Sequence, residues 1–165
     1  MEYQLEHQQI PKQKHSFNLK LMVEDLQSPA NYGMMIRMAE ALGVNEIIFC
    51  SFQFKEITSK MKKSSRSAEN QILVRFTENI EKEFEKFRQK NFEIIGLEYT
   101  SESKNIQDVT FSSSPKILIC GNESTGLSPK TISECDFCIH LPMYGQNSSM
   151  NVVMATSLAF WDIIS

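Results

Sequence analysis

The sequence predicts a single α/β domain built on a mostly parallel β-sheet. Short apolar segments typical of buried strands alternate along the chain with segments that have the 3.6-residue period of helices. Parallel strands are covered on both faces, so they form continuous apolar runs such as residues 117–120. The length of 165 residues suits one domain, and no internal repeat or linker interrupts the alternation.

The first elements follow a short polar segment. Residues 1–17 are rich in Gln, Lys and His without a sustained period, and they predict a loose N-terminal arm or a short first helix. A strand is expected over 18–26, followed by a helix. Ser28 and Pro29 are suited to its N-cap and first position, and Gly43 to its C-terminal end.

The middle of the chain repeats this alternation. A short apolar strand is expected over 45–50, followed by a basic helix or loop within 51–70. The next strand is expected over 72–76. Thr77 is the expected cap of an amphipathic helix, and 92–97 predicts a further strand.

The last third supplies the remaining elements. A Ser-rich connection at 100–114, with at most one helical turn, leads to a strand at 115–120. Ser128 and Pro129 begin another helix, and 136–141 is the last expected strand. An apolar helix over 150–164 closes the domain, and its composition implies burial on more than one side.

Composition limits the classes of partner and compartment. The net charge of −3 and pI of about 5.7 give no overall basic footprint, which leaves only a local cationic patch to bind nucleic acid. No apolar run is long enough for a membrane span, and the first residues do not look like a secretory signal, so we expect a cytoplasmic protein.

The cysteines do not predict a metal or redox site. Four cysteines in a chain of this size suggest thiols in a reducing compartment. Cys135 and Cys138 form an isolated CxxC pair without a second pair, and in a strand their thiols are expected to point to opposite or awkwardly twisted faces. His140 is expected in the core or at its rim, not as a catalyst.

Three polar segments with glycines follow predicted strands. They cover 31–39, 121–127 and 141–152. Each alone is consistent with an ordinary turn. Because ligands of open parallel sheets bind beyond the carboxyl ends of the strands, their Asn, Arg, Glu and Ser side chains predict one shared site.

These segments resemble the three motifs of the SpoU-type tRNA/rRNA methyltransferases of the SPOUT superfamily. The similarity covers about residues 18–164, with the motifs in the family's order. Leu141 and Met150 depart from the family pattern, with roughly conserved volumes. The matching residues are Asn31, Gly33, Arg37 and Ala39 in the first motif, Gly121, Glu123, Gly126 and Leu127 in the second, and Pro142, Met143, Gly145, Ser149, Asn151 and Val152 in the third.

The resemblance implies a specific fold and activity. Residues 18–165 would form a SPOUT domain with a deep C-terminal trefoil knot, preceded by the arm at 1–17. The implied reaction transfers a methyl group from S-adenosylmethionine to a ribose 2′-hydroxyl of tRNA or rRNA, without a metal. The family is typically a homodimer, and the apolar last helix, including Phe160 and Trp161, is compatible with such an interface.

The resemblance also assigns roles to single residues. Arg37 is expected to orient the target phosphate and assist the attacking oxygen, and the proton acceptor stays open because Arg remains protonated in ordinary sites. Glu123 would organise the site around Arg37, or cap the amides of its own turn. Ser149 and Asn151 would lie near the methyl group and the ribose, although Ser149 also suits a helix N-cap. The expected catalytic residues are Asn31, Arg37, Glu123, Ser149 and Asn151.

Two further groups of residues are expected to bind ligands. The expected cofactor-binding residues are Leu97, Gly121, Leu141, Met143, Ser149 and Met150. A solvated charge run is the ordinary interpretation of residues 60–66, but their place in the family's substrate-facing region favours contact with RNA phosphates. The expected RNA-binding residues are Arg37, Lys60, Lys62, Lys63 and Arg66.

Two alternatives belong to other functional classes. A non-catalytic RNA-binding or S-adenosylmethionine-binding member of the same fold would not need Arg37, Glu123, Ser149 and Asn151 together. A flavodoxin-type nucleotide-binding domain would need a Ser/Thr-rich phosphate loop after the first strand. Residues 29–33 are not such a loop.

Overall fold

The computed structural model describes residues 4–6, 9–11, 13 and 15–165. The described residues before Leu19 include no α-helix. The predicted arm falls partly on residues 1–3, 7, 8, 12 and 14, which lie outside the described residues. Its end is attached to the domain, because His15 Nε2 lies 2.9 Å from the carbonyl oxygen of Leu42.

A seven-stranded, all-parallel sheet forms the centre of the domain, which confirms the predicted α/β class. Its strand order is β3-β2-β1-β6-β4-β7-β5. The strands are β1 (Leu19–Glu24), β2 (Glu46–Cys50), β3 (Leu73–Thr77), β4 (Glu93–Leu97), β5 (Lys104–Asn105), β6 (Lys116–Cys120) and β7 (Phe137–His140). The trefoil knot stays a prediction.

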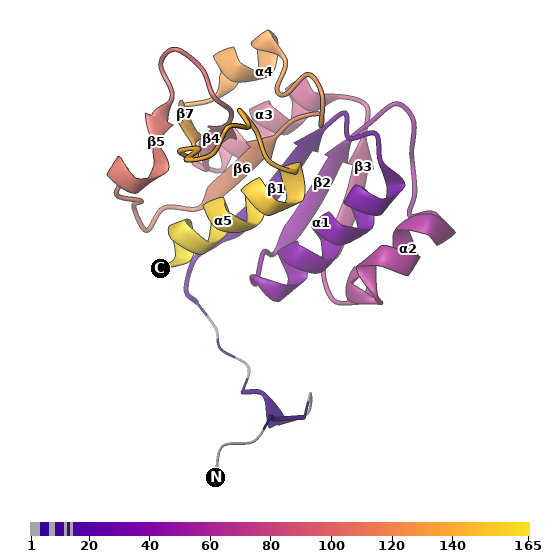
Figure 1. Cartoon of the computed structure of the whole chain (residues 1–165). Coiled ribbons are helices and arrows are strands. Elements are labelled where there is room, and N and C mark those ends of the chain that lie inside the picture. Colours follow the sequence, from indigo (N-terminus) through magenta and orange to yellow (C-terminus); the bar gives the residue numbers. More distant parts are fainter. Residues whose placement is uncertain (1–3, 7–8, 12, 14) are drawn as a thin grey trace.

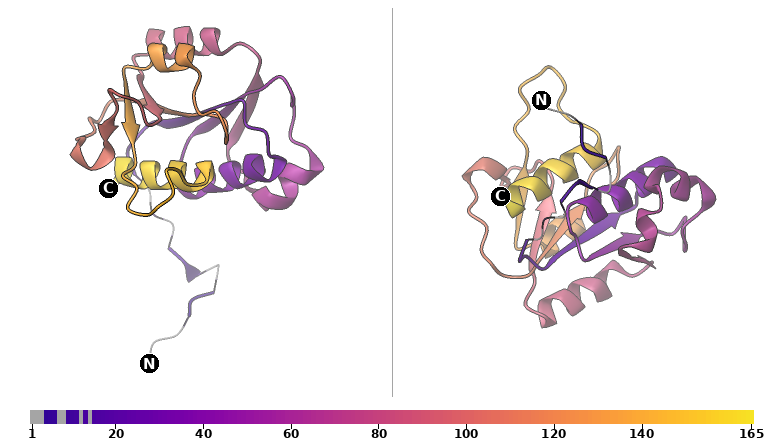
Figure 2. Two further views of the ribbon diagram at one scale, coloured as in Figure 1. Left: turned by 45° about the horizontal axis from the view of Figure 1, so that its top comes forward. Right: turned by 90° about the horizontal axis from the view of Figure 1, so that it is seen from below.

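Helices cover both faces of the sheet, in three layers (Figures 1 and 2). The α-helices are α1 (Pro29–Ala41), α2 (Ser59–Ser65), α3 (Ile80–Gln89), α4 (Pro129–Glu134) and α5 (Val152–Ile164), and two short 3₁₀ helices are η2 (Ala68–Asn70) and η3 (Ile106–Asp108). The hydrophobic core on one face includes residues of α1, α2 and α5, and that on the other includes residues of α3 with α4 beside it. No helix among the described residues is long and apolar enough to cross a membrane.

Strand residues alternate between the two cores, as the period of a strand requires. In β1, Leu21 and Val23 face the helices α1 and α5, whereas Met22 faces α3. In β6, Leu118 belongs to the core beneath α1 and α5, and Ile119 belongs to the core beneath α3. These central strands have no solvent-facing side, so their sequences are mostly apolar; the charged residues are Lys20 and Glu24 of β1 and Lys116 of β6.

The predicted N-cap of the helix α3 is wrong by two residues. Asn79, not Thr77, is the N-cap of α3, and its side chain accepts a hydrogen bond from the N–H of Lys82. Thr77 is instead the last residue of β3, paired with Cys50. Ser128 caps α4 as predicted, with the N–H of Thr131 as donor.

The last helix buries one side and exposes the other. Phe160 is fully buried inside the chain, so it is not available to a partner. Three apolar side chains on the opposite side are exposed: Met154 at 61%, Leu158 at 50% and Trp161 at 64%. Their spacing of four and three residues makes one continuous stripe.

Candidate active site

Strand order brings the three polar segments to one edge of the sheet. β1 and β6 are neighbours, so the chain that follows β1 lies beside the loop at 121–127. β4 lies between β6 and β7. One strand, β4, therefore separates the start of the segment at 141–150 from that loop, and the segment leads directly into α5.

Glu123 connects the loop at 121–127 to the start of α1. Its Oε2 accepts a hydrogen bond from the N–H of Gln27 at 3.0 Å. Its Oε1 accepts two more, from the N–H of Ser28 at 3.1 Å and from Nδ2 of Asn31 at 2.8 Å. Ser28 occupies the predicted N-cap position of α1 but makes no side-chain cap. The Glu123 carboxylate serves there instead, where a helix N-terminus favours negative charge.

These donors also keep Glu123 ionised. Partial burial opposes the charged form, but the hydrogen bonds from Gln27, Asn31 and Ser28 outweigh it and lower the pKa of the carboxyl group below its ordinary value. The carboxylate is therefore charged at neutral pH.

Asn31 extends this chain of hydrogen bonds to the third segment. Its side chain is buried, and its Oδ1 lies 3.5 Å from Nδ2 of Asn151. Asn151 in turn caps α5, because its Oδ1 accepts from the N–H groups of Val153 and Met154. The interpretation of Ser149 as the N-cap of this helix is therefore wrong. One residue from each segment takes part in a single chain, Glu123–Asn31–Asn151.

Arg37 lies on α1, two turns at most from Asn31, and its side chain is exposed. No hydrogen bond or ion pair joins its guanidinium to any residue that the structure describes. Glu123 thus lies against the start of α1 and not against Arg37 itself. The guanidinium cation of Arg37 therefore remains available to bind a substrate anion.

Gly33 brings the basic helix α2 against α1. A Cβ atom at this position would lie 2.1 Å from both the carbonyl oxygen of Met61 and the Oγ of Ser64, so only glycine permits this approach. Arg37 follows Gly33 by one helical turn and lies further along the same side of α1. The predicted RNA-binding residues on and beside α2 are all exposed: Lys60, Lys62, Lys63 and Arg66.

A cavity of about 140 Å³ lies beyond the ends of β4 and β7. Five of the six predicted cofactor-binding residues line it: Leu97, Leu141, Met143, Ser149 and Met150. Gly121 does not. A Cβ there would lie 2.2 to 2.4 Å from backbone atoms of Gly126 and Leu127, so this glycine is required for the closure of its own loop.

The sequence interpretation missed five other residues of this cavity, namely Glu98, Tyr99, His140, Ser148 and Ala155. Tyr99 and His140 form an aromatic wall, with ring centroids 4.2 Å apart. Nδ1 of His140 lies 2.9 Å from Oγ of Ser103. His140 is thus half-buried at the rim of the cavity, and its position directly at the end of a strand was the signal that could have identified it.

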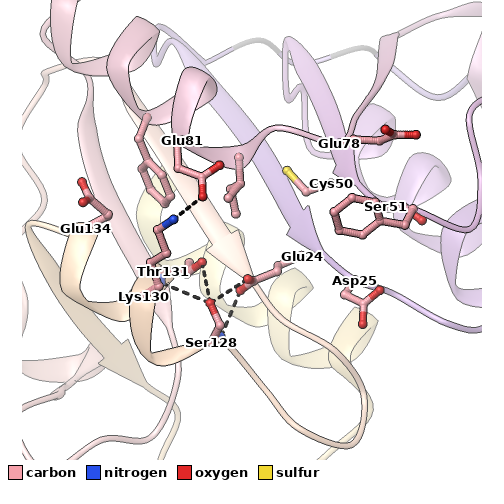
Figure 3. A pocket seen from close by; sticks show the side chains of 13 residues that line it. Glu24, Asp25, Cys50, Ser51, Glu78, Glu81, Ser128, Lys130, Thr131 and Glu134 are labelled. Carbon is pink, nitrogen blue, oxygen red and sulfur yellow. Dashed lines mark hydrogen bonds and ion pairs between the residues drawn. The ribbon is translucent and has the colours of Figure 1, made fainter.

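A larger cavity of about 360 Å³ lies on the face of the sheet that α3 and α4 cover, between these two helices (Figure 3). Glu24, Asp25, Glu78, Glu81 and Glu134 all line it. The one lysine in its lining, Lys130, forms an ion pair with Glu81. None of the predicted site residues is present, and carboxylates would repel the phosphates of RNA.

Cys135 and Cys138 differ in one respect from expectation. Both sulfur atoms approach the same point beside β4, 3.1 and 2.7 Å from the position that a Cβ of Gly96 would take. The expectation that the two thiols point to opposite faces is therefore wrong. Within the described part of the chain, no three His, Cys, Asp or Glu side chains are grouped to hold a metal ion.

Comparisons with known proteins identify a family and similar folds. The model of the SpoU rRNA Methylase family matches residues 18–161. A curated protein of Staphylococcus epidermidis, named for the TrmH family of tRNA/rRNA methyltransferases, is 28% identical over 155 residues, which are 94% of this chain and 61% of that protein. The chain spans about three fifths of the length of the curated relatives that it matches.

Two solved structures have the same fold. One is the SpoU methyltransferase AviRb from Streptomyces viridochromogenes in complex with the cofactor AdoMet, with a TM-score of 0.78 and 24% identity over 96% of this chain and 63% of that chain. The other, described as giving structural insights into the 2-OH methylation of C/U34 on tRNA, has a TM-score of 0.78 and 21% identity, and the match covers 90% of this chain and 95% of that chain.

Proposed function

The chain belongs to the SpoU rRNA Methylase family, and we propose that it is an RNA 2′-O-ribose methyltransferase that uses S-adenosylmethionine. The observation that carries this proposal is the chain Glu123–Asn31–Asn151, which lies beside the cavity between β4 and β7. Residues 18–165 would be the catalytic domain and 1–17 an arm, acting in the cytoplasm.

The residues that line the cavity between β4 and β7 suit S-adenosylmethionine. Leu97, Leu141 and Met150 provide apolar walls for a purine, and Ser148 and Ser149 provide hydroxyl groups for polar parts of the cofactor. When bound, S-adenosylmethionine supplies a methyl group activated by its sulfonium charge. Related proteins support this choice, since one structure of the same fold contains AdoMet.

Positioning and electrostatics would carry the reaction. The ribose oxygen must approach the methyl carbon in line with the bond to sulfur, and the hydroxyl proton must leave. Arg37, exposed and without a described partner, would bind the phosphate next to the target ribose and hold the 2′-oxygen in place. Glu123 would fix the start of α1, and Asn31 and Asn151 would maintain its distance from the third segment.

Cofactor binding tests the first part of the proposal. Titration calorimetry of the folded chain with S-adenosylmethionine and with S-adenosylhomocysteine should show saturable binding of both. Absence of heat and of any thermal shift with either ligand would contradict the assignment.

The exposed residues of α2 lead to a prediction about RNA. Replacing Lys62 and Lys63 by alanine should weaken RNA binding and reduce the slope of log K against log salt by about 1.5, because each phosphate contact contributes roughly 0.7–0.9. The rate at saturating RNA should remain. Replacing Lys82 and Lys90, exposed residues of the opposite layer, is the matched control. Equal loss in both pairs would contradict a specific role for α2.

The exposed stripe on α5 leads to a prediction about assembly. We propose that Met154, Leu158 and Trp161 form part of a homodimer interface. Leu158→Glu should weaken the dimer by at least about 30-fold, because it places a charge in a desolvated contact. Leu73→Glu, at an equally exposed position on the edge strand β3, is the control. Light scattering at micromolar concentration that finds a wild-type monomer would contradict the dimer.

A further inference from the structure

Glu98 joins the wall of the cavity between β4 and β7 to the loop that contains Glu123. It is the first residue after β4, it is half-buried, and it lines that cavity. Its Oε2 accepts a hydrogen bond from the N–H of Leu127 at 2.8 Å. Its Oε1 accepts one from the N–H of Tyr99 at 3.0 Å. One carboxylate thus connects two segments that are 29 residues apart in the sequence.

The loop at 121–127 has the shape that receives this carboxylate. Gly126 has a φ of +68°, and a Cβ atom there would lie 2.1 Å from Oε2 of Glu98. Asn122 and Gly126 close the loop with two backbone hydrogen bonds of 3.1 and 3.0 Å. Closure presents the next N–H group, that of Leu127, to Glu98.

The loss of this contact would leave a buried donor without its acceptor. Leu127 is only 5% exposed, so its N–H group has little access to water. A carboxylate forms stronger hydrogen bonds than a neutral acceptor. The loop therefore depends on Glu98 on one side, as it depends on the contacts of Glu123 with α1 on the other.

We propose that Glu98 is a positioning residue, which holds the loop at 121–127 in a fixed place beside the cofactor cavity. This role rests on the proposed function. Glu98 would act through Leu127 and Tyr99, and the consequence would fall on cofactor affinity more than on the rate at saturating cofactor. Tyr99 belongs to the aromatic wall of the same cavity, so this wall and the loop beside the cavity would both loosen when Glu98 is lost.

The test compares Glu98→Ala, Glu98→Gln and Glu102→Ala in the full chain. The dissociation constant of S-adenosylmethionine, by calorimetry, should rise about tenfold or more in Glu98→Ala, as expected when a buried donor loses a charged acceptor. Glu98→Gln keeps an oxygen for the N–H of Leu127 and should recover most of the affinity. Glu102 is exposed in the same segment, so Glu102→Ala should bind like the wild type.

Hydrogen exchange provides a readout that does not need the cofactor. The amide of Leu127 should exchange faster in Glu98→Ala, while exchange in the central strand β6 stays unchanged. A general loss of stability would instead accelerate exchange in both. If the alanine variant does not fold, Glu98→Asp, which keeps the charge but shortens its reach, replaces it in the same comparison.

Two results overturn the proposal in different ways. If the wild type binds S-adenosylmethionine and the Glu98 variants match it in affinity and in Leu127 exchange, the role of Glu98 is refuted and the proposed function stands. A folded wild type that binds no cofactor refutes the proposed function, and this role with it.

Discussion

Arg37→Ala is expected to lower the rate of methyl transfer to RNA by about 10³-fold, as the loss of a group that acts mainly in the transition state does. S-adenosylmethionine affinity should stay within about twofold of the wild type, because Arg37 is exposed on α1 and does not line the cavity between β4 and β7. Single-turnover rates and calorimetry on the same preparation measure the two effects separately.

Two further variants test this expectation: Arg37→Lys is the conservative substitution, and Arg88→Ala is the control. Lysine keeps the charge but not the planar set of donors, so Arg37→Lys should recover only a small part of the rate. Arg88 is an exposed arginine on α3, in the layer opposite to α1, where it forms an ion pair with Glu134 of α4. Arg88→Ala should therefore methylate RNA normally. An Arg37→Ala protein with an unchanged rate would refute the catalytic role, and one that has lost cofactor binding would make Arg37 structural.

Glu123→Ala is expected to lower the rate by about 10²-fold and to reduce thermal stability. The substitution removes the acceptor of the hydrogen bonds from Gln27, Ser28 and Asn31, so the start of α1 and the Asn31–Asn151 contact lose their common support. Effects of residues that act as a unit are non-additive. Asn31→Ala should therefore add little when it is combined with Glu123→Ala. Ser124→Ala, exposed in the same loop, is the control.

The lowered pKa of Glu123 adds a dependence on pH. A carboxyl group with a lower pKa in the folded protein stabilises the fold above its ordinary pKa, and this stabilisation is lost as the pH falls through the folded value. Glu123→Gln should therefore cost more stability at neutral pH than in acid, as thermal unfolding across the acid range would measure. An equal cost at every pH would contradict a role for the charge.

Elements of the fold could be predicted from the sequence wherever the local pattern determines them. The apolar run that becomes β6 and the pair Ser128-Pro129 that begins α4 are examples. β5 was missed because it has only two residues, Lys104 and Asn105, and exists through its pairing with β7. The helix caps were misplaced because Thr77, Asn79, Ser149 and Asn151 are all suitable caps, and packing decides where each helix begins.

The residues of the candidate site could likewise be predicted only in part from the sequence. Polar residues after strands β1, β6 and β7 could be assigned to one edge of a parallel sheet. Glu98 and Tyr99 could not, since their approach to Leu127 and His140 depends on the order β6-β4-β7, which is not the order of the sequence. Gly33 was recognised as a motif residue. The reason that glycine is required there is the close approach of α2, which is visible only in the tertiary structure.

Methyl transfer to RNA in vitro tests the central claim most directly. Total RNA from cells without this protein should be incubated with the purified chain and isotopically labelled S-adenosylmethionine, then digested to nucleosides for mass spectrometry. The account predicts label on the ribose of one nucleoside, resistance of the adjacent phosphodiester to alkali, and no label with Arg37→Ala. Label on a base, or no label from a folded chain that binds the cofactor, would contradict it.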